Sequence, residues 1–242
     1  MRDYAKEFKN RVEFIKDVIK ESGAKGIVFG NSGGKDCALV GILCKAACDN
    51  TVGIILPCSS KRNYEADTND ALKVANQFNI KSEVIDLTPV KESLLKELEK
   101  IATPNNVCLT NIAPRLRMTS LYAYAACNNM LVAGTGNKSE VYVGYFTKWG
   151  DGGHDFNPIY DLTVSEVYEF LEYLKAPEII IKKAPSAGLF EGQTDEDDMG
   201  VKYSDIDNYI LYGKGEKEVI EKIENMHKRT NHKREEIKRY KG

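Results

Sequence analysis

The feature that most constrains this chain is an apolar run that leads directly into a glycine-rich turn. Residues 26–29 are Gly-Ile-Val-Phe, and the turn after them consists of Gly30, Asn31, Ser32, Gly33, Gly34, Lys35, Asp36 and Cys37. A buried strand, a glycine turn and a helix that opens near Asp36 direct backbone N–H groups toward one point, where a helix N-terminus favours negative charge. The segment therefore predicts an anion-binding loop at the end of a strand.

This loop departs from two common nucleotide-binding signatures. The P-loop requires G-x-x-x-x-G-K-[ST], but the glycine spacing here is one residue short, and Asp36 follows Lys35 where Ser or Thr should stand. The G-x-G-x-x-G motif is absent as well. A carboxylate beside phosphate is explained by a bridging cation such as Mg²⁺, whereas the alternative is that Asp36 only caps the following helix. The local sequence leaves both interpretations open.

Segments with strand and helix periodicity alternate along the chain up to residue 134. Strands are predicted at residues 26–30, 51–56, 80–87 and 130–134, and helices at residues 3–22, 36–48, 64–78, 89–101 and 111–128. Such alternation is typical of βαβ units in a parallel sheet, which binds ligands at the carboxyl ends of its strands. We therefore predict an α/β fold with a doubly wound, mostly parallel sheet and flanking helices.

The pattern changes after Tyr145. A loop rich in Gly and Asp precedes a predicted helix at residues 163–174, and an irregular stretch precedes helices near residues 203–211 and 215–229. Neither an internal repeat nor a low-complexity linker separates these parts. We expect a single domain over residues 1–242, with a nucleotide-binding core at about 22–180 and a helical C-terminal part at about 200–242.

The charge balance and the cysteine pattern argue against several classes of protein. The 242 residues include 34 Lys and Arg and 36 Asp and Glu, and this balance does not suit broad nucleic-acid binding. No segment approaches the roughly 20 apolar residues of a membrane span, and the N-terminus lacks the apolar core of a signal peptide. The six cysteines form no CxxC pair, which favours free thiols over a zinc site. We expect a cytoplasmic protein.

Several charged side chains are candidates for the crevice, each with an ordinary alternative. Glu140 follows the turn at residues 134–139 and is either a second metal ligand or a glutamate at a helix start. Arg115 is either a partner for carboxylate or phosphate oxygens or a solvated surface residue. The run Asp-Glu-Asp-Asp at residues 195–198 is typical of a solvated acidic patch. The local sequence does not decide between these alternatives.

Taken together, the motifs resemble those of one enzyme family. Residues 32–37 are similar to the SGGxDS loop of the ATP pyrophosphatase superfamily. Further segments resemble the NAD synthetase pattern in the same order along the chain, at residues 115–118, 134–140, 143–152, 157–158, 183–187 and 192–196. The resemblance covers roughly residues 8–234 and implies an adenine nucleotide alpha hydrolase-like fold.

The resemblance implies an ATP-dependent amidation of deamido-NAD to NAD with ammonia, through an adenylated carboxylate, with release of AMP and pyrophosphate. It assigns ATP binding to residues 30–37, Thr135 and Ser186, and Mg²⁺ binding to Asp36 and Glu140. It assigns deamido-NAD binding to Arg115, Lys148, Asp155, His232 and Lys233, and catalytic roles to Asp36, Lys148 and Asp155. A homodimer is implied. Glutamine-dependent relatives carry a long amidase domain that these 242 residues do not contain, so we expect free ammonia, or an amidase on another chain, as the donor.

The chain departs from the family pattern at three places. Cys37 replaces the usual Ser, Val164 stands where relatives commonly have an ATP-binding Lys, and the tail after Arg234 lacks the usual proline-containing ending. Lys35 is a candidate to replace the missing charge. Two alternatives stay open: another SGGxD-type adenylating ligase or tRNA-thiolating enzyme, and a non-catalytic nucleotide-binding regulatory module.

Overall fold

A computed structural model of the chain describes residues 2–58, 66–183 and 194–240. Its sheet contains β1 (Gly26–Gly30), β2 (Thr51–Ile55), β3 (Lys81–Val84) and β4 (Met130–Ala133), in the spatial order β3-β2-β1-β4. All neighbouring strands are parallel, and Phe29 of β1 is opposite Gly53 and Ala133. The predicted α/β fold is confirmed. The strand order reverses between β1 and β4, which is where such sheets open a binding crevice.

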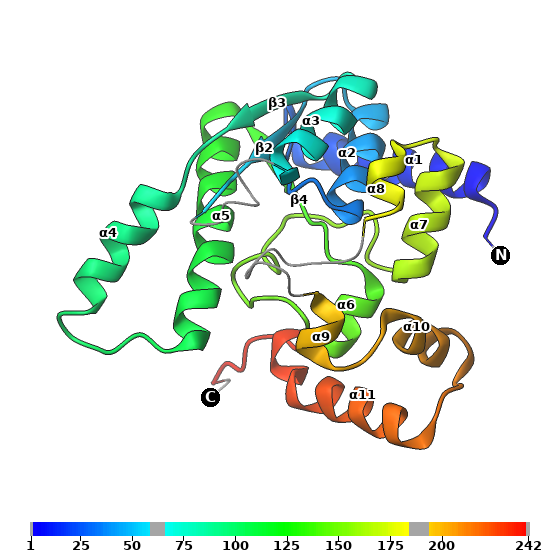
Figure 1. The fold of residues 1–242 in the computed structure, drawn as a ribbon. Helices are drawn as coiled ribbons and strands as arrows, with labels where there is room; N and C mark the ends of the chain where they lie inside the picture. Colours follow the sequence, from blue (N-terminus) through cyan, green and yellow to red (C-terminus); the bar gives the residue numbers. More distant parts are fainter. Residues whose placement is uncertain (1, 59–65, 184–193, 241–242) are drawn as a thin grey trace.

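Helices cover both faces of this sheet, as the doubly wound prediction requires (Figure 1). One face carries α1 (Tyr4–Ser22), α2 (Lys35–Ala47), α3 (Thr68–Gln77), α7 (Val164–Tyr173) and α8 (Glu178–Ile181), and the other carries α5 (Asn106–Asn128). Side chains of β1 alternate between the faces: Ile27 and Phe29 belong to the core with α1 and α2, and Val28 belongs to the core with α5. Two cores therefore fix β1 and the loop after it.

Several element boundaries differ from the predictions by one to five residues, as the ends of α3 and α4 (Thr88–Leu98) do. β3 ends at Val84 rather than at residue 87, although the N–H of Leu87 still donates a backbone hydrogen bond to the segment after β2. α5 begins at Asn106 rather than at residue 111, because the side chain of Asn105 accepts a hydrogen bond from the N–H of Cys108 at 2.9 Å and caps the helix. A cap of this kind starts a helix before its apolar period becomes visible in the sequence.

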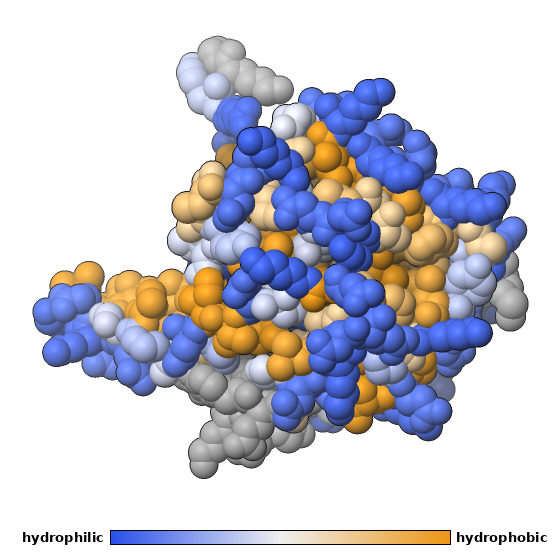
Figure 2. All heavy atoms as spheres, turned by 90° about the horizontal axis from the view of Figure 1, so that it is seen from above, coloured by the Kyte–Doolittle hydropathy of each residue, from blue (hydrophilic) through white to orange (hydrophobic). Residues whose placement is uncertain are grey.

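An arm, formed by α4 (Thr88–Leu98) and the chain up to residue 109, projects from the body of the molecule (Figure 1). None of the residues of α4 is buried. Figure 2 shows apolar surface along this arm, which carries the exposed side chains Val90, Leu94, Ile101, Val107 and Leu109. The arm therefore exposes apolar area that its own chain does not cover in the described structure.

The remaining helices lie below the sheet in Figure 1 and surround a third apolar core that includes Val143, Ile206 and Ile223. They are α6 (Lys138–Val143), α9 (Asp195–Met199), α10 (Tyr203–Tyr212), α11 (Lys217–Arg229) and the 3₁₀ helix η2 (Asn231–Lys233). The sequence predicts α10 and α11 but not α6, α8, α9 or η2, which are too short to show a helical period. None of the described helices combines the length and apolar character that a bilayer crossing requires.

Candidate active site

A cavity of about 440 Å³ opens at the carboxyl ends of β1, β2 and β4. Its lining includes most of the residues predicted for ATP and metal, namely Gly30, Asn31, Ser32, Gly34, Lys35, Asp36, Cys37, Thr135 and Glu140. Lys233 of η2 also lines it, from the other end of the chain. The structure therefore brings both predicted crevice loops to one cavity. Of the other residues predicted for ATP, Gly33 is not among the lining residues, and Ser186 lies outside the described residues.

The glycine loop has a fixed backbone shape. Gly33 has a φ of +73°, and a Cβ on it would lie only 2.2 Å from the carbonyl oxygen of Asp67. Gly34 is the N-cap residue of α2, and within the described residues no side chain forms the capping hydrogen bond. Asp36 lies in the first turn of α2, so the interpretation that it only caps the helix is wrong. The N-terminus of α2 is left open for an anion.

Cys37 is buried behind this loop. Its Sγ lies 3.1 Å from the carbonyl oxygen of Gly34 and 3.3 Å from Oγ of Ser32. Burial raises the pKa of the Cys37 thiol, which is therefore neutral at physiological pH. Cys37 thus supports the loop as a neutral side chain and is not a poised nucleophile.

Asp36 and Glu140 lie close together in the cavity lining, and Asn137 donates a hydrogen bond to one oxygen of each. The side-chain amide of Asn137 donates to Oδ1 of Asp36 at 3.0 Å, and its backbone N–H donates to Oε2 of Glu140 at 3.2 Å. The other oxygens, Asp36 Oδ2 and Glu140 Oε1, lie 2.7 and 4.0 Å from the ammonium of Lys35. The structure thus contains a cation position between two carboxylates, and a side-chain ammonium takes it.

This oxygen pair fits Mg²⁺. The ion usually takes one or two protein carboxylates and completes its shell with substrate phosphates and water. Among the described residues, no group of three or more His, Cys, Asp or Glu side chains is placed to hold a metal. Asp36 and Glu140 could be two protein ligands for it, with a nucleotide and water supplying the rest.

The charges of this cluster do not cancel. Burial by itself lowers the pKa of Lys35, but Asp36 and Glu140 outweigh burial and raise that pKa above its ordinary value. The pKa of Glu140 is raised as well, by burial and by the Asp36 carboxylate, against the opposing effect of Lys35. One ammonium thus faces two partly buried carboxylates and does not balance the charge of both.

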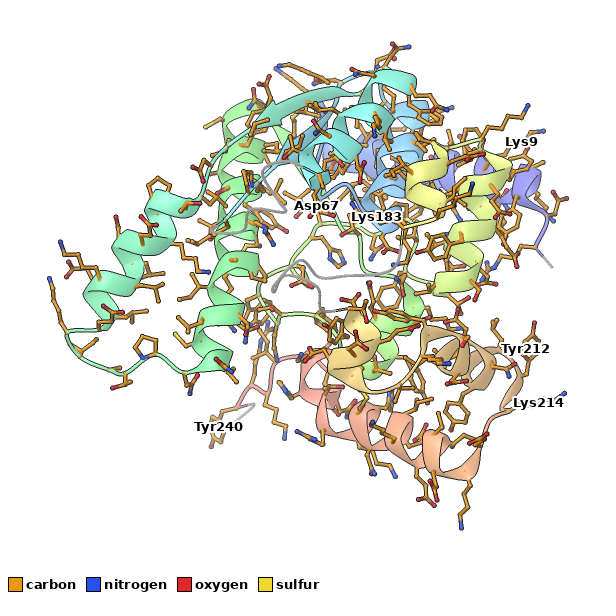
Figure 3. All side chains as sticks on the ribbon, in the orientation of Figure 1. Lys9, Asp67, Lys183, Tyr212, Lys214 and Tyr240 are labelled. Atoms are coloured by element: carbon orange, nitrogen blue, oxygen red, sulfur yellow. The ribbon has the colours of Figure 1, made fainter. Side chains whose placement is uncertain are left out.

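A second lysine, Lys183, contacts the same loop and also lines the cavity. Its Nζ donates to the carbonyl oxygen of Gly33 at 3.1 Å, to Asp67 at 2.8 Å and to Asp70 at 2.9 Å. Figure 3 shows Lys183 and Asp67 side by side between α3 and the end of α8. The contact ties the glycine loop to the start of α3.

The residues predicted for deamido-NAD do not all reach the cavity. Arg115, Lys148 and His232 form a chain of contacts beside it: Arg115 donates to the carbonyl of Lys148 at 3.4 Å, and Lys148 donates to the carbonyl of His232. Asp155 accepts hydrogen bonds from the N–H of Val132 at 2.7 Å and from the hydroxyl of Tyr122 at 3.0 Å. Of the residues predicted for this substrate, Lys233 alone lines the cavity.

The structure adds site residues that the sequence interpretation misses. Asn137 could have been found, because Asn137 and Glu140 have the spacing of a capping box, which the structure contains. Asp195 corrects a prediction: it is not part of a solvated patch but is 5% exposed, lines the cavity and accepts a hydrogen bond from the hydroxyl of Tyr203 at 3.3 Å. A charge run gives no sign of which of its members turns inward.

Comparison with known proteins decides the family. The sequence model of the NAD synthase family matches residues 7–237. The chain belongs to this family. It is 49% identical to the NH(3)-dependent NAD(+) synthetase of Carboxydothermus hydrogenoformans, with 92% of both chains covered. It is 41% identical to that of Archaeoglobus fulgidus, with 92% of this chain and 91% of the other covered.

Solved structures of the same family have the same architecture. The NMN synthetase of Francisella tularensis superimposes with a TM-score of 0.94 at 36% identity, and both chains are covered in full. The NH3-dependent NAD synthetase of Campylobacter jejuni superimposes with a TM-score of 0.83 at 31% identity, again with full coverage of both chains. The sheet and its helices are therefore those of this family.

Proposed function

We propose that this chain catalyses the ATP-dependent amidation of deamido-NAD to NAD with ammonia. The observation that carries the proposal is the cavity where the glycine loop, Thr135 and the pair Asp36 and Glu140 meet. An open helix N-terminus and two carboxylates that can share a cation suit a nucleoside triphosphate that loses pyrophosphate. The printed activity of the relatives, NH(3)-dependent NAD(+) synthetase, supports the same reaction.

The proposed reaction has two steps. The nicotinate carboxylate attacks the α-phosphorus of ATP, and the bond from that phosphorus to pyrophosphate breaks. Ammonia then attacks the carbonyl carbon of the acyl adenylate, AMP leaves, and the surplus proton passes to solvent. The backbone N–H groups at the start of α2 would bind the pyrophosphate end of ATP. Asp36 and Glu140 would hold Mg²⁺, which supplies positive charge to the leaving group.

We place the nicotinate end of the substrate beside Arg115, Lys148 and His232. The side chains of Arg115 and Lys148 supply two cationic groups there, and such groups suit the carboxylate and phosphates of a dinucleotide. Lys148 and Asp155 would orient the reacting carboxylate. The C-terminal part contributes Asp198 and Lys233 to the cavity lining, which supports one functional domain over residues 1–242.

The test is a product assay. Purified protein with ATP, Mg²⁺, deamido-NAD and ammonia should form NAD, AMP and pyrophosphate in equal amounts. Release of ADP, or binding of ATP without turnover, would contradict the adenylation mechanism and favour a regulatory nucleotide-binding module. Glutamine as the sole nitrogen donor should give little NAD, and efficient use of glutamine would show an amidase activity that the proposal lacks.

A second candidate substrate is nicotinic acid mononucleotide, which would give NMN. The observation that favours it is the full-length superposition on the Francisella tularensis NMN synthetase. The chemistry at the carboxylate is the same, so the difference lies only in the adenylyl half of the substrate. Parallel measurement of kcat/KM for the mononucleotide and for deamido-NAD separates the two, and we expect the dinucleotide to be preferred.

We infer further that two copies of the chain pair in solution. The exposed apolar side chains of the arm, among them Val90, Leu94 and Val107, support this inference. Sedimentation or light scattering should give about twice the mass of 27.1 kDa. A Leu94→Glu and Val107→Glu double variant should shift the protein toward monomer if the arm forms the contact, and an unchanged mass would place the contact elsewhere.

A further inference from the structure

We propose that Lys35 is a built-in counter-ion that occupies the metal position until Mg²⁺ arrives together with nucleotide. This inference rests on the proposed function only in that the metal is the one assigned to Asp36 and Glu140. Lys35 comes from the same helix turn as Asp36, and its side chain is 6% exposed. Its ammonium lies between the carboxylate oxygens that Asn137 does not hold.

The ammonium of Lys35 is held by charge more than by hydrogen bonds. It has three donors, but among the described residues it makes one hydrogen bond, to Asp36 at 2.7 Å. Glu140 is 4.0 Å away, and the ring centroids of Tyr168 and Tyr203 lie at 5.9 and 5.6 Å. The aromatic faces stabilise a cation without fixing its position. This ammonium can therefore move when a better partner is offered.

Mg²⁺ alone does not offer the ammonium of Lys35 a better partner. If it displaced the ammonium, the positive charge of Lys35 would remain in a buried pocket beside a divalent ion, with both carboxylates taken. A nucleotide changes the balance, because its phosphate oxygens can accept the displaced ammonium. We therefore expect Mg²⁺ and ATP to bind with positive coupling, which must be reciprocal.

The experiment measures Mg²⁺ binding without turnover. Wild-type protein is titrated with MgCl₂ alone and with MgCl₂ in the presence of ATP, and binding is followed by calorimetry and by the melting temperature. MgCl₂ alone should leave the wild type almost unchanged. Lys35→Met removes the competing charge, so it should bind Mg²⁺ alone with a Kd lower by about tenfold or more and melt higher when Mg²⁺ is added.

Two further variants make the result specific. Lys35→Gln keeps a hydrogen-bond donor for Asp36 but removes the charge, and it should behave like Lys35→Met. Lys45→Met is the matched control, because Lys45 lies on the same helix and pairs with Asp49 at the surface, where Asp49 is fully exposed. This control should respond to MgCl₂ as the wild type does.

The outcomes separate this proposal from the proposed function. A gain in Mg²⁺ affinity for the Lys35 variants supports the counter-ion even if no NAD is formed. Unchanged Mg²⁺ affinity in both variants overturns it even if NAD is formed. Should the variants fail to fold, the wild type still decides: a Kd for Mg²⁺ alone below about 0.1 mM, with no coupling to ATP, overturns the proposal.

Discussion

Two lysines lie at the glycine loop, one within it and one in contact with it, and each faces two carboxylates. Lys183 contacts Asp67 and Asp70, and Lys35 contacts Asp36 and Glu140. Both lysines line the cavity. Each cluster thus places one lysine beside two carboxylates, and Asp70 pairs in addition with Lys73 at 3.6 Å. The clusters differ in how completely the ammonium is satisfied.

Lys183 has an acceptor for each of its three donors, at 2.8, 2.9 and 3.1 Å, and the third is the carbonyl of Gly33 itself. Lys35 has one acceptor at hydrogen-bond distance and a second carboxylate at 4.0 Å. A saturated ammonium fixes the loop, because any movement breaks several bonds at once. An unsaturated one yields to a ligand. The difference suggests a structural role for one cluster and a ligand-exchange role for the other.

Asp36→Asn should have the largest effect, because it removes a proposed metal ligand from the cluster of Lys35, Asp36 and Glu140. We expect kcat/KM for NAD formation to fall by roughly 10²–10³-fold or more, with little change in fold, since Asn can still accept the hydrogen bond from Asn137. Product assays and circular dichroism measure both. Asp70→Asn, in the cluster of Lys183, Asp67 and Asp70, is the matched control and should keep most of kcat. A near-normal kcat for Asp36→Asn at saturating Mg²⁺ would remove the metal role.

The fold could be predicted from the sequence because local signals and packing agree. The apolar strands, the glycine turn and the helices between them repeat often enough to specify a parallel sheet. The open N-terminus of α2 follows from Gly33 and Gly34 being adjacent. Boundaries depended on single caps, as at Asn105, and short helices such as α9 have no period to detect.

The candidate site could be predicted only in part. Asp36 and Glu140 were found through motifs, and the structure places them in the first turns of α2 and α6, where both line the cavity. The pairing of Lys35 with both carboxylates, and of Lys183 with Gly33, depends on where long side chains reach in the folded chain. No spacing in the sequence encodes the contact of Lys35 with Glu140 or that of Lys183 with Gly33, because these partners come from separate elements.

Gly33→Ala adds a Cβ to the glycine loop and tests whether the backbone shape of this loop depends on glycine. The positive φ and the closeness of the Asp67 carbonyl oppose any Cβ there, so the free energy of unfolding should fall by about 2–3 kcal/mol. Gly34→Ala is the control: its φ is −95°, and its Cβ would meet only Oγ of Ser32, at 3.3 Å. We expect less than about 1 kcal/mol there. Urea unfolding without ligands measures both, and equal losses would contradict a strained loop.

Lys183→Met removes the ammonium that contacts Asp67 and Asp70. The side chains are 10–18% exposed, so we expect a loss of about 1–2 kcal/mol, less than for a fully buried pair. The KM for ATP should rise severalfold while kcat changes little, because the loop is less well positioned. Lys182→Met is the matched control, since Lys182 pairs with Glu178 at the surface, and should change neither. A fall in kcat alone would point to direct chemistry by Lys183.

A third ion cluster, which does not line the cavity, gives a reference without ligand effects. Burial would raise the pKa of Asp161, but Arg11 and Arg2 outweigh it and lower that pKa to about 2. A lowered carboxyl pKa stabilises the fold above the ordinary pKa, and this stability is lost as pH falls toward 2. Because Asp161 is half exposed, Asp161→Asn should cost about 1 kcal/mol at pH 7 and almost nothing near pH 2. Urea unfolding at both pH values measures this, and a pH-independent loss would contradict the ion pair.

Cys37→Ser should have the smallest effect. The Sγ of Cys37 contacts Ser32, Gly34 and Asn31 at 3.1–3.6 Å, all within the loop. A hydroxyl is a better donor than a thiol but reaches less far, so stability should change by less than about 1 kcal/mol and the KM for ATP by about two- to threefold. Cys127→Ser, at an exposed position, is the control and should change neither. A change in KM above about tenfold would show that the side chain of Cys37 contacts ATP itself. Phosphate binding by the loop would then depend on this side chain as well as on backbone N–H groups.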